Sequence, residues 1–188
     1  MANNIENIIA TPRYTECYAS LAKERIIFVS ELITKSLASS LSALLLFYDA
    51  ENDTDDINLY INTNGGDVDA LTNIYDVMQM IKSPIKTVCI GKAYSAGSVI
   101  LAAGTKGKRF MTKNASVVIH GLQSNSAQTD QKEAEIYFKY LKGHHNMVLD
   151  ILAKHTGQPI EKIVEDCKKD TYFDATQALE YGIIDKIV

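Results

Sequence analysis

Short apolar runs alternate with amphipathic stretches over the first 120 residues. The runs are rich in β-branched residues and are bounded by charges or glycine, as buried strands are; they cover 25–29, 57–61, 87–90, 108–111 and 116–119. Between them, apolar side chains recur every three or four residues over 34–50, 67–81 and 95–103, which is the period of an α-helix. This alternation predicts an α/β fold with parallel strands and right-handed crossovers.

The pattern changes in the last third of the chain. Residues 130–155 form one long helical stretch, and we expect it either to cross the whole core or to protrude toward another subunit. Asp174 and Gln177 have the spacing of a capping box that opens a last short helix, and Gly182 is expected to end it. Gly91 is expected to end the third strand, and residues 1–20 to be an arm with little structure of its own.

Composition excludes several classes of function. The chain has 188 residues, the size of one domain, and 19 basic against 23 acidic side chains give a net charge of −4. This balance argues against a nucleic-acid or membrane partner recruited through bulk charge. The three cysteines are dispersed without a CxxC pair, which argues against a zinc site and suits a reducing compartment, so we expect the protein in the cytoplasm.

Three strand ends carry residues suited to acyl transfer. Ser95 lies where the third strand passes into a helix rich in small residues, and free backbone N–H groups at a helix start can stabilise an anion. Gly65 and Gly66 follow the second strand and permit a turn that points an N–H group outward. His120 closes the strand over 116–119. Because ligand sites of parallel sheets gather at the carboxyl ends of strands, Gly66, Ser95 and His120 are candidates for one shared site.

Each of these residues also has an ordinary structural interpretation. Small residues let a helix pack closely on a sheet, and Ala93 stands where a nucleophile elbow has glycine. An imidazole base needs an acceptor, usually a carboxylate, and spacing alone does not choose among the 23 acidic residues. The remaining histidines, His144, His145 and His155, lie within the long helical stretch and are expected to be solvated.

Together these motifs resemble the ClpP family, the proteolytic subunit of the ATP-dependent Clp protease. The resemblance runs in order from about residue 25 to the C-terminus and rests on the runs YINTNGG (60–66), IGKAYSAGS (90–98), AAGTKGKRF (102–110), VIH (118–120), HTGQPIEKI (155–163) and ALEYGIID (178–185). It implies a crotonase-like fold of repeated ββα units with a protruding long helix. Residues 1–188 would be a single protease domain, with an N-terminal arm over 1–20 and a handle-type helix at about 130–155.

The resemblance implies a Ser–His–Asp catalytic triad. By position in the family motifs, its members are Ser95, His120 and Asp170, with Asp166 and Asp174 as the nearest rivals for the acid. The family's oxyanion hole consists of two backbone N–H groups, which map to Gly66 and Ala96. Asp170 is assigned wholly by resemblance, whereas the residues alone also predict the turns at Gly66 and Ser95. No metal or cofactor is implied for the cut.

The family also implies partners. It encloses its sites in two stacked seven-membered rings, fed with unfolded protein and peptides by an AAA+ Clp unfoldase. This chain has no G-x-x-x-x-G-K-[ST] loop, so a partner would hydrolyse the ATP. Phe47 and Tyr60 match positions in the family's hydrophobic clefts for docking the ATPase, and the long helix would meet the opposite ring.

Two alternatives remain open from sequence. The residues that flank Ser95 and His120 depart from the family pattern, with Tyr94 and Ala96 around the serine and Gly121-Leu122 after the histidine. One alternative is therefore a catalytically silent ring subunit that binds partners. The other is an acyl-CoA enzyme of the crotonase fold, which would use two backbone donors without needing the serine.

Overall fold

The computed structural model describes residues 12–122 and 131–188. Its helices are α2 (Pro12–Lys23), α3 (Lys35–Glu51), α4 (Val68–Met80), α5 (Ala96–Ala102), α6 (Gln131–Thr156), α7 (Ile160–Asp166) and α8 (Ala175–Tyr181). Its strands are β1 (Ile26–Val29), β2 (Ile57–Thr63), β3 (Ile85–Tyr94), β4 (Arg109–Met111), β5 (Ser116–Ile119), β6 (Thr171–Phe173) and β7 (Lys186–Ile187). The predicted mixed α/β fold is confirmed, and the long helix predicted over 130–155 is α6.

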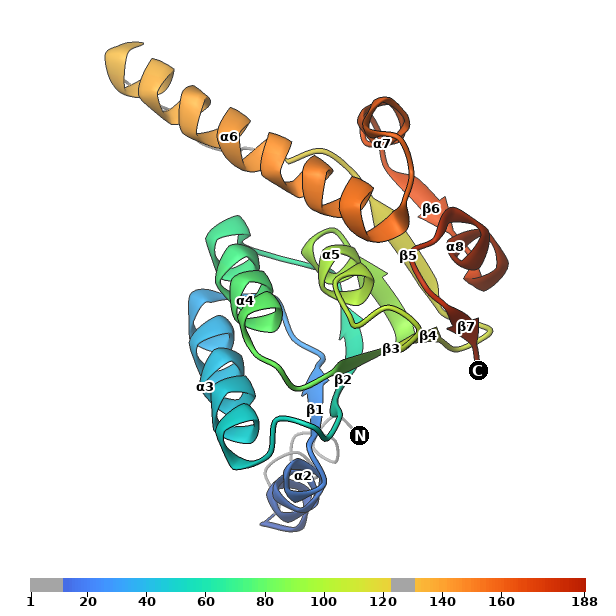
Figure 1. Ribbon diagram of the computed structural model, residues 1–188. Helices are drawn as coiled ribbons and strands as arrows, with labels where there is room; N and C mark the ends of the chain where they lie inside the picture. The colour runs from blue at the N-terminus through green and yellow to red at the C-terminus, as the bar shows by residue number, and fades with distance from the viewer. Residues whose placement is uncertain (1–11, 123–130) are drawn as a thin grey trace, which may run out of the picture.

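The strands form one sheet whose main path runs β1-β2-β3-β4-β7 with parallel pairing. The second half of β3 pairs with β5 instead, and β6 runs antiparallel to β5. Figure 1 shows α3 and α4 side by side against the sheet, α5 beside α4, and α6 passing above α4 and α5 and projecting beyond them. The carboxyl ends of β2, β3 and β5 therefore meet beneath α6.

Gly91 does not end β3, so that expectation is wrong. Its φ of +88° is open to glycine at little cost and lets the strand bend and continue. The register shows the bend, because Ile61 lies opposite Cys89 whereas Thr63 lies opposite Ala93, with extra residues of β3 between them. The bend carries the end of β3 to β5, and Ser95 follows directly.

The core lies between the sheet and the helices. Strand β2 alternates buried and more exposed residues, and α5 is buried along its whole length. A Cβ atom on Gly97 of α5 would lie 2.7 Å from Thr63 Cγ2, so this helix approaches the sheet more closely than any larger residue would allow. Helix α6 is buried only in its second half, from Val148, while Ile136 and Phe138 near its start are 72% and 63% exposed.

The N-terminal region differs from the expectation. Residues 12–20 belong to α2 and are not an arm with little structure, whereas residues 1–11 lie outside the described part of the chain. Arg25, which lies between α2 and β1, is only 9% exposed and donates hydrogen bonds to the carbonyl oxygens of Tyr48 and Asn52 at the end of α3. These contacts with α3 are distant in sequence, so a local pattern does not reveal them.

Candidate active site

Ser95 occupies a sharp turn between β3 and α5. Its backbone angles, φ 54° and ψ −123°, are rarely adopted by residues other than glycine. The Ser95 N–H donates to the carbonyl of Val118 on β5 at 2.9 Å, and the Ser98 backbone and hydroxyl both donate to the carbonyl of Ser95. These bonds hold a strained turn that displays a serine at the end of a strand, the geometry of a nucleophile elbow.

A second turn, at Gly65 and Gly66, lies against the first. A Cβ atom on Gly65 would lie 2.7 Å from the Ser95 Cβ and 3.0 Å from the Ala96 nitrogen, so the two turns touch. The Thr63 hydroxyl accepts a hydrogen bond from the Gly65 N–H and fixes the start of the turn. From the sequence, this proximity is expected only because ligand sites gather at the carboxyl ends of parallel strands. The structure shows that the two turns are in direct contact.

His120 follows β5 and is half-buried. Its Nδ1 lies 2.5 Å from the carbonyl oxygen of Gly121. A carbonyl oxygen only accepts, so this contact places a proton on Nδ1, and in the neutral ring Nε2 then has the free lone pair. A neutral imidazole in this tautomer has the protonation state that a general base requires.

One narrow cavity joins the serine, the histidine and the two turns. Its volume is about 20 Å³, and its walls are otherwise mostly apolar; the lining residues are Gly66, Val68, Leu71, Ser95, Ala96, Ser98, Val99, Ile119, His120, Leu122, Val148 and Leu152. A wider cavity of about 410 Å³ adjoins it and also contains Gly66, Ser95 and His120. The structure therefore brings four of the five predicted catalytic and oxyanion residues to one place.

Asp170 lies exposed in the turn just before β6. Ile119 pairs with Thr171 in the β5–β6 register, so the next residues along, His120 and Asp170, lie opposite each other. The side chains of Ser95, His120 and Asp170, all within the described residues, share no hydrogen bond in this structure. The β5–β6 pairing thus places Asp170 opposite His120, but the Asp170 carboxylate does not hydrogen-bond to the imidazole.

The two rival carboxylates have structural tasks. Asp166 accepts hydrogen bonds from the Tyr181 hydroxyl at 2.6 Å and from Lys162 at 2.7 Å. Burial raises the pKa of Asp166, but these hydrogen bonds outweigh burial and hold the pKa below its usual value. Asp174 caps α8 in the predicted capping box with Gln177. Both side chains are therefore already engaged in contacts within their own segments.

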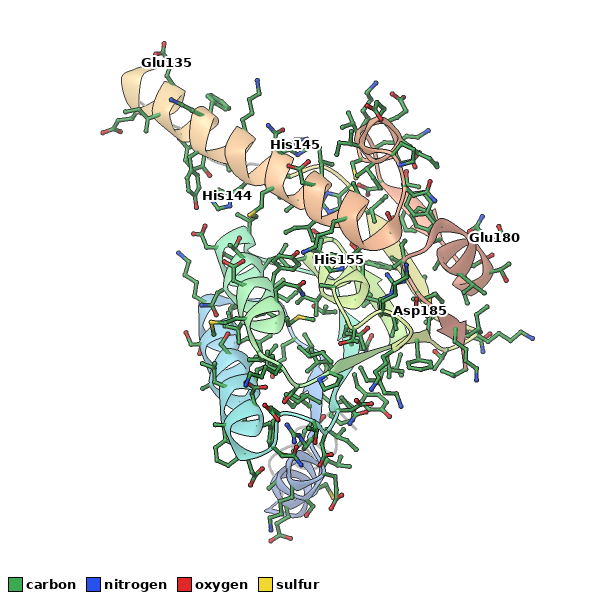
Figure 2. The ribbon with its side chains drawn as sticks, viewed as in Figure 1. Glu135, His144, His145, His155, Glu180 and Asp185 are labelled. Atoms are coloured by element: carbon green, nitrogen blue, oxygen red, sulfur yellow. The ribbon has the colours of Figure 1, made fainter. Side chains whose placement is uncertain are left out.

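The expectation that the histidines of the long helix are solvated is wrong. His144, His145 and His155 are all partly buried on α6, where Figure 2 labels them. His155 is within 3.1 Å of the Tyr75 hydroxyl, and burial together with Lys154 and Arg109 lowers the pKa of its imidazole to about 4. Helical spacing did not reveal this burial because the covering residues belong to other elements.

Phe47 and Tyr60, the predicted docking residues, lie in separate aromatic contacts. Phe47 is 58% exposed and packs edge-on against Tyr48, whereas the Tyr60 ring stacks on Phe28 at 5.4 Å. In residues 12–122 and 131–188 we find no group of three histidine, cysteine or acidic side chains placed to hold a metal ion. None of the described helices combines the length and the apolar character that a membrane crossing requires.

Sequence reasoning overlooked part of the wider cavity. Asn64 and Asp67 line it from the turn before α4, and Tyr137 and Leu141 line it from α6. The sequence does show that Asp67 can cap α4, but nothing in it places that side chain beside Ser95.

Comparison with known proteins identifies what this arrangement is similar to. A family model described as Clp protease matches residues 10–188 of the chain. A curated relative from Dehalococcoides mccartyi, named ATP-dependent Clp protease proteolytic subunit, is 41% identical over 184 residues, which cover 98% of this chain and 92% of the relative.

Proposed function

Because the chain belongs to the Clp protease family, which supports a peptidase role, we propose that it is a serine endopeptidase that cuts peptides and unfolded proteins. The catalytic residues would be Ser95, His120 and Asp170. The observation that carries this proposal is the strained backbone of Ser95 in a cavity that it shares with His120 and Gly66.

The chemistry is acyl transfer. The Ser95 hydroxyl oxygen attacks the peptide carbonyl carbon, His120 Nε2 takes the hydroxyl proton, and the same proton passes to the leaving amine as the C–N bond breaks. Water then attacks the acyl-enzyme with His120 again as the base. Backbone N–H groups of Gly66 and Ala96 stabilise the oxyanion, each contributing ~3 kcal/mol to lowering the barrier.

Asp170 would orient the imidazole during this reaction. The Nδ1–H of His120 points at the Gly121 carbonyl in this structure. A change of the 121–122 backbone or of the ring would transfer that N–H to the carboxylate opposite it, where it stabilises the imidazolium that forms. The active arrangement therefore differs from this one by a local exchange of hydrogen-bond acceptor.

A fluorophosphonate probe tests the nucleophile, because the oxygen of an activated serine displaces fluoride from its phosphorus. We expect one label per chain, found by peptide mass on Ser95 and lost in Ser95→Ala. Ser40→Ala, which removes an exposed hydroxyl on α3, should label as the parent does. Absence of label on a folded, assembled protein, or a label elsewhere, overturns the proposal.

The contact of His120 with Gly121 favours one alternative, a catalytically silent ring subunit. Such a subunit would form rings and remain unlabelled, so the same experiment separates the two. The acyl-CoA enzyme would not need Ser95, and the strained backbone at that residue counts against it.

The assembly belongs to the same proposal. We expect two stacked seven-membered rings that enclose the sites and receive substrate from an AAA+ Clp ATPase, for which Phe47 and Tyr60 are proposed docking residues. Exposed Ile136 and Phe138 on α6 support a contact between rings. All three cysteines are free thiols, which supports a location in the reducing cytoplasm.

A further inference from the structure

The wider cavity beside Ser95 contains a carboxylate for which catalysis has no use. The residues around this space of about 410 Å³ are Asn64, Gly66, Asp67, Val68, Ser95, His120, Leu122, Tyr137 and Leu141. Among these described lining residues, Asp67 supplies the one carboxylate, and none is a lysine or an arginine. A substrate peptide that reaches Ser95 therefore passes an anion.

Among the described residues, Asp67 has a hydrogen-bond partner on Oδ1 alone, so its second carboxylate oxygen is unpaired there. As the N-cap of α4, it accepts the Ala70 N–H on Oδ1 at 2.8 Å. Within residues 12–122 and 131–188, the ion pairs of this turn go to Asp69, which lies 3.4 Å from Lys35 Nζ and accepts the Tyr140 hydroxyl. The negative charge of Asp69 is thus paired with Lys35. The negative charge of Asp67 has no such partner among the described residues and can interact with a ligand.

The other walls of the cavity suit a long cationic side chain. The Tyr137 ring, which stacks nearly parallel to that of Tyr140 with centroids 6.4 Å apart, offers an aromatic surface that attracts a cation. Val68, Leu122 and Leu141 offer apolar surface. Lysine and arginine side chains match these walls, because each has an apolar stem and a charged head group. Both residues commonly bury the stem against apolar surface and leave the charged group in water.

We propose that Asp67 is a specificity-determining residue that favours peptides with a lysine or arginine close to the scissile bond. The inference rests on the proposed protease function and names a substrate class for that site. The effect is modest, because Asp67 is exposed to water and the positive end of α4 offsets part of its field. An exposed ion pair corresponds to about a two- to fivefold preference in kcat/KM.

The test uses short fluorogenic peptides of one sequence with an apolar residue before the scissile bond. At each of three positions on either side, one peptide carries lysine and its partner carries norleucine, which has a similar stem without the charge. Pairs compete in one reaction, and mass spectrometry locates the cuts. Asp67→Asn retains an N-cap side chain and removes the charge. Asp76→Asn makes the same change on the exposed face of α4, outside the cavity.

We expect the parent and Asp76→Asn to prefer lysine two- to fivefold at one position or more, and to lose most of that preference in high salt. Asp67→Asn should reduce the ratio to about one. Equal ratios in the parent and Asp67→Asn, or cleavage by the parent without a lysine preference, overturn the inference alone. If an assembled protein cuts none of the peptides and takes no fluorophosphonate label, the protease proposal fails, and the inference fails with it.

Discussion

At the scale of single residues, the proposed chemistry depends on keeping Ser95 in an unfavourable backbone conformation. Such a conformation costs about 1–3 kcal/mol and persists only where the surroundings hold it. Here four hydrogen bonds do so: one from the Ser95 N–H to Val118, and three to the Ser95 carbonyl, two from Ser98 and one from the Val99 N–H. The absence of a side chain at Gly65 is equally necessary, because the neighbouring turn lies directly against the serine.

Gly65→Ala should therefore impair the nucleophile. The new Cβ would lie 2.7 Å from both the Ser95 Cβ and the Tyr94 carbonyl oxygen, so one of the two turns must move. We expect fluorophosphonate labelling of Ser95 to slow at least tenfold. Gly107→Ala is the matched control, because Gly107 has a similar φ of +86° but nothing within 4 Å of the added atom. Equal labelling rates for the two variants would contradict this account.

At the scale of elements, the end of α6 is fastened by a buried polar network. His155 contacts the Tyr75 hydroxyl of α4, and its carbonyl accepts a hydrogen bond from Arg109 at 2.8 Å. Arg109 is only 4% exposed and pairs with Asp185, near the C-terminus, at 2.6 Å. Helix α6, the sheet and the C-terminal segment are thereby joined through one guanidinium group.

This network makes stability depend on pH. Burial and two nearby cations lower the pKa of His155 to about 4, against about 6.5 in an unfolded chain. Between these values the unfolded chain binds more protons, so the stabilisation present at neutral pH is lost as the pH falls from 6.5 toward 4. After allowance for partial exposure, we expect His155 to account for on the order of 1 kcal/mol of the loss between pH 7 and pH 5.

Urea unfolding of the parent and of His155→Gln at both pH values measures this contribution. Glutamine keeps a hydrogen-bonding side chain but does not titrate, so the variant should lose less stability on acidification. The difference between the two proteins removes the contribution of every other titrating group. A pH dependence that is identical in both would show that His155 is not responsible.

At the scale of the whole molecule, the first half of α6 carries apolar side chains that the described residues leave largely exposed. Figure 1 shows this half projecting beyond the layers of the domain. Ile136 and Phe138 are largely exposed there and are therefore available for contact with another subunit. The proposed contact with a second ring would bury these side chains.

Replacing both residues, as Ile136→Asp with Phe138→Asp, should separate the rings. The domain itself should remain folded, because α6 is anchored by its second half through Val148, Leu149, Ile151 and Leu152. We expect light scattering to give about half the parent mass with unchanged circular dichroism. Ser36→Asp with Ser40→Asp adds the same two charges on exposed positions of α3 as a control. A double variant that keeps the full mass would place the ring contact elsewhere.

Periodicity and caps predicted the elements well where they depend on near neighbours in the chain. The helices from Thr34 to Ile81, the capping box at Asp174 and the left-handed end at Gly182 are all of this kind. Strand β6 was not predicted, because three residues are too short for a pattern and only the pairing with β5 defines them. The bend at Gly91 was missed for a related reason, since glycine can end a strand or bend it.

By itself, then, the amino-acid sequence determined the alternation of strands and helices and the presence of Ser95 and Gly66 at neighbouring strand ends. These depend on side-chain period and on backbone preferences within a few residues. Only the tertiary structure decided that Asp166 and Asp174 have other tasks, that His155 is buried, and that Asp67 lies beside the serine. Such facts depend on register and packing between segments that are far apart along the chain, and no local pattern encodes them.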